Sequence, residues 1–180
     1  MKKAFLTIAV IAITMLSSSE AFAQKFPKLD VSPLDASSYP SHWKVSDKLV
    51  KVVYGRPQLK GRSLDKLAPQ NEVWRTGANE AAEIIFYKDV VFGGEKVKAG
   101  TYSLFTIPGK NKWTIILNSA KNVWGHYTYK VDQDVVRVKG EVSNSDKPIE
   151  AFSIVFEGEG NNAIMYFGWA NTIVSVDIKG

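Results

Sequence analysis

The sequence predicts an all-β, antiparallel domain, with a β-sandwich as the favoured architecture and a flattened β-barrel as the alternative. Hydrophobic residues recur at every second position over at least four segments, which is the period of a half-buried strand. Turn-forming residues separate the segments at intervals of about 8–12 residues, as in sandwiches and barrels. No segment has the periodicity of a helix of about three turns. We therefore expect about eight to ten short strands and little helix.

The expected strands fall into two groups. Strands that bury one face are expected at residues 47–55, 134–142, 151–158 and 172–179, where apolar and polar side chains alternate. Strands that are apolar on both faces, as in central strands or strands with one face under a loop, are expected at residues 82–87, 101–107, 113–118 and 163–169.

The residues between these segments are typical of turns. Gly93-Gly94 suits a two-residue hairpin turn. Pro108-Gly109, residues 158–162 and Ala170-Asn171 indicate three further turns. The stretch before Pro69 is expected to form one helical turn.

Residues 1–23 have the pattern of a cleaved secretory signal peptide. Lys2 and Lys3 precede an apolar run over residues 4–16, and Ala21-Phe22-Ala23 fits the small-x-small cleavage pattern. The apolar run is shorter than the roughly 20 residues of a membrane-spanning helix. We therefore expect an exported protein, located in a bacterial periplasm or outside the cell.

The remaining chain is expected to form a lead-in, residues 24–43, and one β-sandwich domain, residues 44–180. The lead-in contains three prolines and no sustained periodicity, so we expect it to be extended. Its apolar side chains suggest that it lies on the domain; they are Phe26, Leu29, Val31, Leu34 and Tyr39.

Composition excludes several classes of protein. The 180-residue chain has no cysteine, which excludes a disulfide scaffold, a thiolate metal site, a cysteine nucleophile and a lipid anchor on cysteine. Without residues 1–23, which carry two Lys and one Glu, 21 basic and 17 acidic residues remain, a net charge of +4. The lysines are scattered, so this excess predicts a solvated surface and no nucleic-acid partner.

The distribution of arginine points to a polar site. Three of the four arginines, Arg56, Arg62 and Arg75, lie within 20 residues of one another, whereas the chain has 19 lysines. The planar guanidinium suits bidentate contacts to an anion and stacking on an aromatic ring such as Tyr54. The arginines form either an anion or polar-ligand site or a structural network with Glu80, and the sequence leaves both hypotheses open.

The bend at residues 71–80, "NEVWRTGANE", carries more functional side chains than a connection needs. Gly77 and Asn79 are suited to turning the chain. We expect Trp74 to pack in the core and Arg75 and Glu80 to share one polar network at a cavity. General acid–base catalysis by Glu80 lacks a convincing second carboxylate nearby.

No metal site or cofactor is predicted. The two histidines, His42 and His126, are more than 80 residues apart, whereas zinc normally takes three or four ligands. Asp132 and Asp134 lack the spacing of a calcium loop. Trp124 is the tryptophan expected at the surface, as a sugar-stacking residue or as a packing residue.

Five motifs in order resemble the DUF2911 family, a domain of unknown function found largely among exported proteins of Bacteroidetes-type bacteria. They span residues 54–62, 73–81, 98–109, 113–118 and 123–129. The resemblance implies no catalytic role, because the family carries no established activity. A small residue usually follows the Trp-Gly pair in the family, so His126 departs from the pattern.

The favoured hypothesis is an exported, non-enzymatic protein that binds a polar or anionic ligand, such as a glycan. The alternatives are a hydrolase-type enzyme that uses Glu80 with Arg75, and a structural envelope protein without a small ligand. The candidate ligand-binding residues are Tyr54, Arg56, Arg62, Arg75, Asn79, Glu80 and Trp124.

Cleavage after Ala23 gives the first testable prediction. Protein recovered from the exported fraction should begin at Gln24, because the small residues at positions 21 and 23 fit the signal-peptidase pattern. N-terminal sequencing or intact mass measurement checks this. A chain that retains Met1 in a cytoplasmic pool would contradict it.

Overall fold

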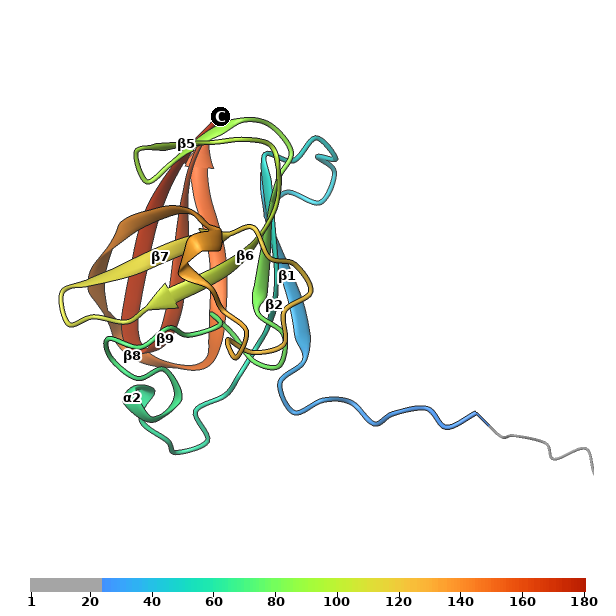
Figure 1. Ribbon diagram of the computed structural model, residues 1–180, viewed down its shortest axis with the longest axis vertical. Coiled ribbons are helices and arrows are strands. Elements are labelled where there is room, and N and C mark those ends of the chain that lie inside the picture. Colours follow the sequence, from blue (N-terminus) through green and yellow to red (C-terminus); the bar gives the residue numbers. More distant parts are fainter. Residues whose placement is uncertain (1–23) are drawn as a thin grey trace, which may run out of the picture.

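The computed structural model describes residues 24–180, so the expected signal peptide lies outside the described residues. Within this range the strands form a nine-stranded sheet in the order β1-β2-β3-β6-β7-β8-β9-β4-β5, with every pair antiparallel (Figure 1). The elements are β1 (Leu34–Tyr39), β2 (Val50–Gly55), α2 (Leu64–Leu67), β3 (Ala82–Phe86), β4 (Val90–Phe92), β5 (Glu95–Val97), β6 (Gly100–Ile107), β7 (Lys112–Asn118), a 3₁₀ turn (Val131–Gln133), β8 (Asp134–Glu159) and β9 (Asn162–Lys179).

The predicted all-β, antiparallel fold with little helix is confirmed. All eight segments that the sequence marks as strands lie in strands, and the turn before Pro69 is the four-residue helix α2. Gly93 and Gly94 form the predicted hairpin turn between β4 and β5, both with positive φ (55° and 96°). Over residues 24–180 the sheet is not closed into a barrel, so the alternative architecture is not formed.

The sheet folds over a single main core instead of closing. Tyr54 of β2 contacts Phe152 of β8 with ring centroids 5.6 Å apart, and Phe86 of β3 contacts Phe92 of β4 at 5.8 Å. These contacts join strands that are not neighbours in the sheet. The two ends of the sheet therefore face each other across the core, as the two layers of a sandwich do.

The central strands β6 and β7 are buried on both faces, as their apolar sequences predict. Leu104 and Ile115 face the main core. The neighbouring Phe105 and Ile116 face a second, smaller cluster with Val123. Val123 belongs to the loop at residues 119–133, which therefore covers the outer face of β6 and β7. We call this segment the covering loop.

Two local predictions differ from the structure. Ala170-Asn171 does not form a turn, because β9 continues through it; Ala170 has a φ of 53° and lies where the register with β8 shifts. A bulge and a tight turn both use left-handed residues, so the sequence does not distinguish them. Residues 34–39, expected in the lead-in, form the edge strand β1. Ser37 and Ser38 interrupt the apolar pattern, so the sequence does not show this segment as a strand.

The lead-in also differs in its packing. Tyr39 is buried, as expected. Phe26, Leu29 and Val31 are 85%, 97% and 71% exposed, and residues 24–30 belong to no strand or helix. The N-terminal part of the lead-in therefore extends away from the body of the domain (Figure 1).

An aromatic cluster occupies the main core around Trp74. Its indole stacks on Trp169 of β9, with ring centroids 5.5 Å apart, and meets Trp113 of β7 and Phe152 of β8 edge to face. Trp74 is 3% exposed, although it lies in the connection between α2 and β3. Its burial confirms the expectation that Trp74 packs in the core.

Replacing Trp74 should therefore destabilise the fold strongly. We expect Trp74→Ala to lower the free energy of unfolding by about 3–5 kcal/mol, because it removes a large side chain that three aromatic rings surround. The exposed Trp124 is the matched control, and Trp124→Ala should change stability by about 0.5 kcal/mol or less. Urea denaturation of both variants measures the difference. Equal losses would contradict the burial of Trp74.

Candidate functional site

The 71–80 bend is fixed to the sheet on both sides of Trp74. The Trp74 N–H donates to the Thr106 carbonyl at 2.7 Å, and the Thr106 N–H donates back at 2.9 Å. Thr76 is fully buried, with its hydroxyl 3.2 Å from that of Thr106. Arg75 accepts the N–H of Ala82 through its carbonyl at 3.0 Å, which closes the bend.

Glycines allow the bend to approach the end of β2 closely. A Cβ atom at Gly55 would lie 2.1 Å from the Ala78 carbonyl oxygen, and one at Gly77 would lie 2.9 Å from the Gly55 oxygen. Both distances are below ordinary contact, so only glycine permits this backbone packing. The glycine of "RTGANE" is thus explained by packing, without a role in ligand binding.

Asn79 and Glu80 leave the bend and pair with the covering loop. The Ala81 N–H donates to Val123 O at 2.8 Å, and the Gly125 N–H donates to Asn79 O at 2.9 Å. These two bonds flank the isolated antiparallel pair Glu80↔Trp124. Pairs flanked in this way have closely spaced Cα atoms and side chains on the same face.

The Glu80↔Trp124 pair is open to solvent. Trp124 is 62% exposed and Glu80 is exposed. Within residues 24–180 the Glu80 carboxylate forms neither an ion pair nor a hydrogen bond. An uncommitted carboxylate and an exposed indole therefore lie side by side.

The expected network of Arg75 with Glu80 is not formed among the described residues. Arg75 forms no ion pair there, and its Nε is buried without a hydrogen-bond partner. A structural network of the arginines with Glu80 would need a contact between Glu80 and an arginine, and the described residues form none.

Arg56 and Arg62 are engaged elsewhere. Arg56 donates to Asp35 at 3.1 Å, to the Phe152 carbonyl at 3.1 Å and to the Ser153 hydroxyl at 2.8 Å. Arg62 donates to two carbonyls of its own loop, Leu59 O at 2.9 Å and Gln58 O at 2.7 Å. The arginines that are adjacent in sequence therefore do not gather into one anion-binding cluster.

Tyr54 is a core residue that reaches the edge of the site. Its hydroxyl accepts the Ile154 N–H at 3.0 Å, and burial raises the pKa of its phenol. Tyr54 also lines a small cleft with Glu80 and Glu83, whose volume is about 40 Å³. A water occupies about 30 Å³, so this cleft does not hold a sugar ring.

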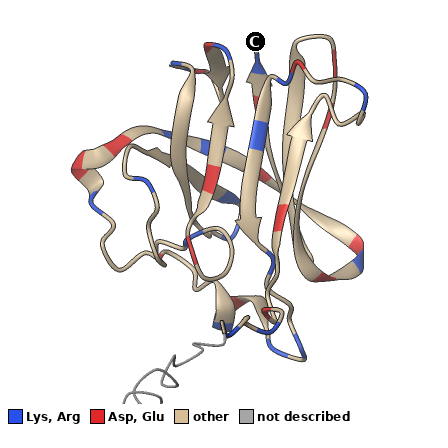
Figure 2. Cartoon of the chain, turned by 90° about the vertical axis from the view of Figure 1, so that its right-hand side faces the viewer, with Lys and Arg blue, Asp and Glu red and all other residues tan. Residues whose placement is uncertain are grey.

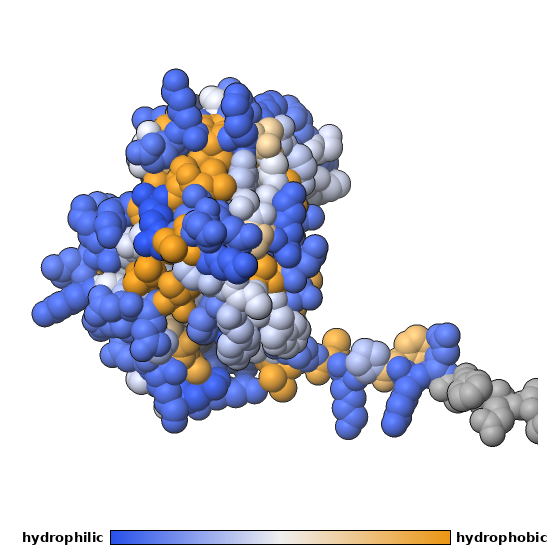
Figure 3. All heavy atoms as spheres, in the orientation of Figure 1, coloured by the Kyte–Doolittle hydropathy of each residue, from blue (hydrophilic) through white to orange (hydrophobic). Residues whose placement is uncertain are grey.

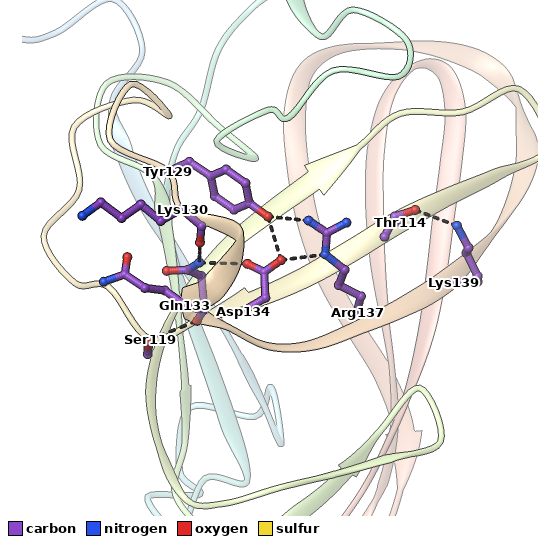
Figure 4. A network of polar contacts seen from close by, with 9 residues as sticks. Thr114, Ser119, Tyr129, Lys130, Gln133, Asp134, Arg137 and Lys139 are labelled. Atoms are coloured by element: carbon purple, nitrogen blue, oxygen red, sulfur yellow. Dashed lines mark hydrogen bonds and ion pairs between the residues drawn. The ribbon is translucent and has the colours of Figure 1, made fainter.

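A polar network that the sequence did not reveal anchors the far end of the covering loop (Figure 4). The Asp134 carboxylate accepts from Tyr129 Oη at 2.7 Å, from Arg137 Nε at 2.6 Å and from Asn118 Nδ2 at 2.8 Å. Burial, followed by the hydrogen bond to Asp134, raises the pKa of Tyr129. The only signal of this network in the sequence is the position of Arg137, the fourth arginine, three residues after Asp134.

Charged residues of both signs are mixed over the surface of residues 24–180, along strands and loops (Figure 2). Residues 24–180 contain no cluster of three His, Cys, Asp or Glu side chains suited to a metal ion. None of the helices in that range is long and apolar enough to span a membrane.

The family model of a protein of unknown function, DUF2911, matches residues 32–178. The chain belongs to the DUF2911 family. The match covers β1 to β9, and it includes both the 71–80 bend and the covering loop of this DUF2911 domain. No curated protein and no solved structure matches the chain.

The Asp134 network should stabilise the loop measurably. Asp134→Ala removes a carboxylate that is 7% exposed and leaves three donors without their acceptor, so we expect a loss of about 1–3 kcal/mol in unfolding free energy. Glu141→Ala, which breaks the exposed pair with Lys112, is the control and should cost about 1 kcal/mol or less. Chemical denaturation compares them. A loss no larger than the control's would show that the network is not structural.

Proposed function

We propose that this DUF2911 protein is an exported, non-enzymatic binding module for glycans, with its binding site at Trp124 and Glu80. One observation carries the proposal: the exposed indole and the uncommitted carboxylate are cross-strand neighbours on one face. The pattern of residues 1–23 supports export.

This pair suits the chemistry of a sugar ring. A pyranose has one face of C–H groups, which pack on a flat indole, and a rim of hydroxyl groups. The indole supplies a large rigid apolar surface. A carboxylate accepts hydroxyl hydrogen bonds that are stronger than bonds between neutral groups. Trp124 therefore provides contact area, and Glu80 provides orientation.

A second exposed aromatic ring, Tyr127, lies in the same loop three residues after Trp124. Gly125 has a φ of 68°, and a Cβ atom there would lie 2.6 Å from Cε2 of Tyr127. The Tyr127 ring therefore packs directly over Gly125, and it also stacks on His126. The covering loop therefore exposes a second aromatic ring, Tyr127, in addition to Trp124.

The loop that carries these rings is held before any ligand binds. Its start pairs with residues 79–81 through two backbone bonds, and Asn122 donates its N–H to Glu83 at 3.0 Å. Its end is held by Asp134. A site that is already ordered loses little conformational entropy on binding, which favours affinity.

The same contacts favour binding over hydrolysis. Glycosidases use two carboxyl groups that flank the scissile bond, roughly 5–9.5 Å apart with the sugar between them. The carboxylate nearest to Glu80 in sequence, Glu83, accepts a backbone N–H of the loop. The two share only the cleft of about 40 Å³. Glu80 is therefore assigned to orienting a ligand.

Binding should depend on both members of the pair. We expect Trp124→Ala and Glu80→Gln each to weaken binding of a captured glycan by about tenfold or more, which corresponds to about 1.4 kcal/mol. A panel of immobilised neutral and acidic glycans identifies the ligand, and calorimetry measures its affinity. Both residues are exposed, so the melting temperature should stay close to that of the parent.

Trp43→Ala is the matched control, because Trp43 is an exposed tryptophan that stacks on His42 outside the site. It should leave affinity unchanged. Capture of no glycan by the parent would favour the structural envelope protein. Equal weakening by all three variants would place the site elsewhere.

A further inference from the structure

The outer face of β8 and β9 contains a groove that the glycan site does not use. Its volume is about 400 Å³. The register shifts between Asn144 and Ile149 and between Ile149 and Ser153 produce irregular pairing there, and so bend the two long strands. At its centre Gly168 faces Ser153, and a Cβ at Gly168 would lie 2.8 Å from Ile149.

The groove is lined mostly by apolar side chains and is acidic at one end. Val155 pairs with Tyr166 across the two strands, and Ile149 and Ile173 continue the apolar lining. Val155, near the C-terminal end of β8, is a large apolar side chain that is 50% exposed. Glu157 is exposed at the end of the lining and forms no ion pair within residues 24–180.

A second unpartnered apolar feature is the arm, which we define as residues 24–33. Phe26, Leu29 and Val31 are almost fully exposed, and hydrophilic residues separate them along the arm (Figure 3). Lys25 and Lys28 give the arm a basic character. Three large apolar side chains held in water favour a contact that covers them.

The root of the arm lies beside the groove. Pro33 accepts the Arg56 N–H through its carbonyl at 3.0 Å, and the Arg56 guanidinium donates to Ser153, which lines the groove. Beyond this root the nine residues 24–32 span at most about 30 Å when extended. That length exceeds what is needed to cross two strands.

The conformation of the arm favours the groove of a second copy over its own. The Ser32 N–H donates to the Asp30 carboxylate at 2.6 Å, and Pro33 fixes the next φ, so the root is bent. From this bend the arm runs away from its own body (Figure 1). Pro27 and Pro33 lack an N–H, which favours docking through side chains on a sheet face over adding a strand to an edge.

We propose that two copies of this chain exchange arms, and that each arm lies in the groove of the other copy. Phe26, Leu29 and Val31 cover the lining around Val155 and Tyr166, and Lys28 pairs with Glu157. A two-fold axis makes the contact reciprocal, which is the usual symmetry of protein dimers. This inference is independent of the glycan site.

Sedimentation velocity of the chain from Gln24 to Gly180, over a hundredfold range of concentration, tests the proposal. We expect a dimer that dissociates on dilution. Phe26→Ser with Leu29→Ser in the arm, and separately Val155→Lys in the groove, should each raise the dissociation constant more than tenfold. Trp43→Ser, at an exposed site outside both features, should not. Circular dichroism confirms that each variant is folded.

Two further measurements make the test specific. Lys28→Glu should weaken the dimer, and adding Glu157→Lys should restore it, because the exchange of charges recreates the pair. A mixture of the arm variant and the groove variant should form a mixed dimer with one intact contact. A parent that is monomeric throughout, or an arm that docks within one chain, would overturn the proposal.

Discussion

The burial of Trp74 is the interaction on which the rest of the molecule depends. Its indole contacts rings from β7, β8 and β9, so one side chain joins strands that are distant in the sequence. The two backbone bonds to Thr106 attach the same residue to β6. Because Trp74 belongs to a connection, its burial turns a loop into a fixed part of the core.

A fixed connection determines where the following residues lie. Gly77 packs against Gly55. Glu80, three residues later, lies opposite Trp124 of the covering loop. The loop is held at its start by residues 79–81 and at its end by Asp134. The exposed pair therefore stands on rigid backbone, although neither residue belongs to a long strand.

Much of the fold could be predicted from the sequence, because alternation of apolar side chains depends only on which face of a strand is buried. The strand β1 was not predicted, because an edge strand with two serines buries too few apolar side chains to show the alternation of a strand. Trp124 and Glu80 were each recognised as candidates. Their pairing was not predictable, since a bridge across 44 residues depends on backbone hydrogen bonds that leave no pattern in the sequence.

The arginines show that residues close together in the sequence need not meet in the structure. Their clustering in sequence suggested one anion-binding centre, but Arg56 and Arg62 form hydrogen bonds to carbonyl groups and to other fixed partners. The planar donors of a guanidinium can stabilise irregular backbone in a fold as well as they can bind a ligand. With those two positive charges committed, the residue paired with Trp124 is the exposed carboxylate Glu80, and the half-buried Glu83 accepts a backbone N–H of the loop. A carboxylate repels anions and accepts hydrogen bonds from hydroxyl groups, so the site that we propose would favour a neutral, hydroxyl-rich ligand over an anionic one.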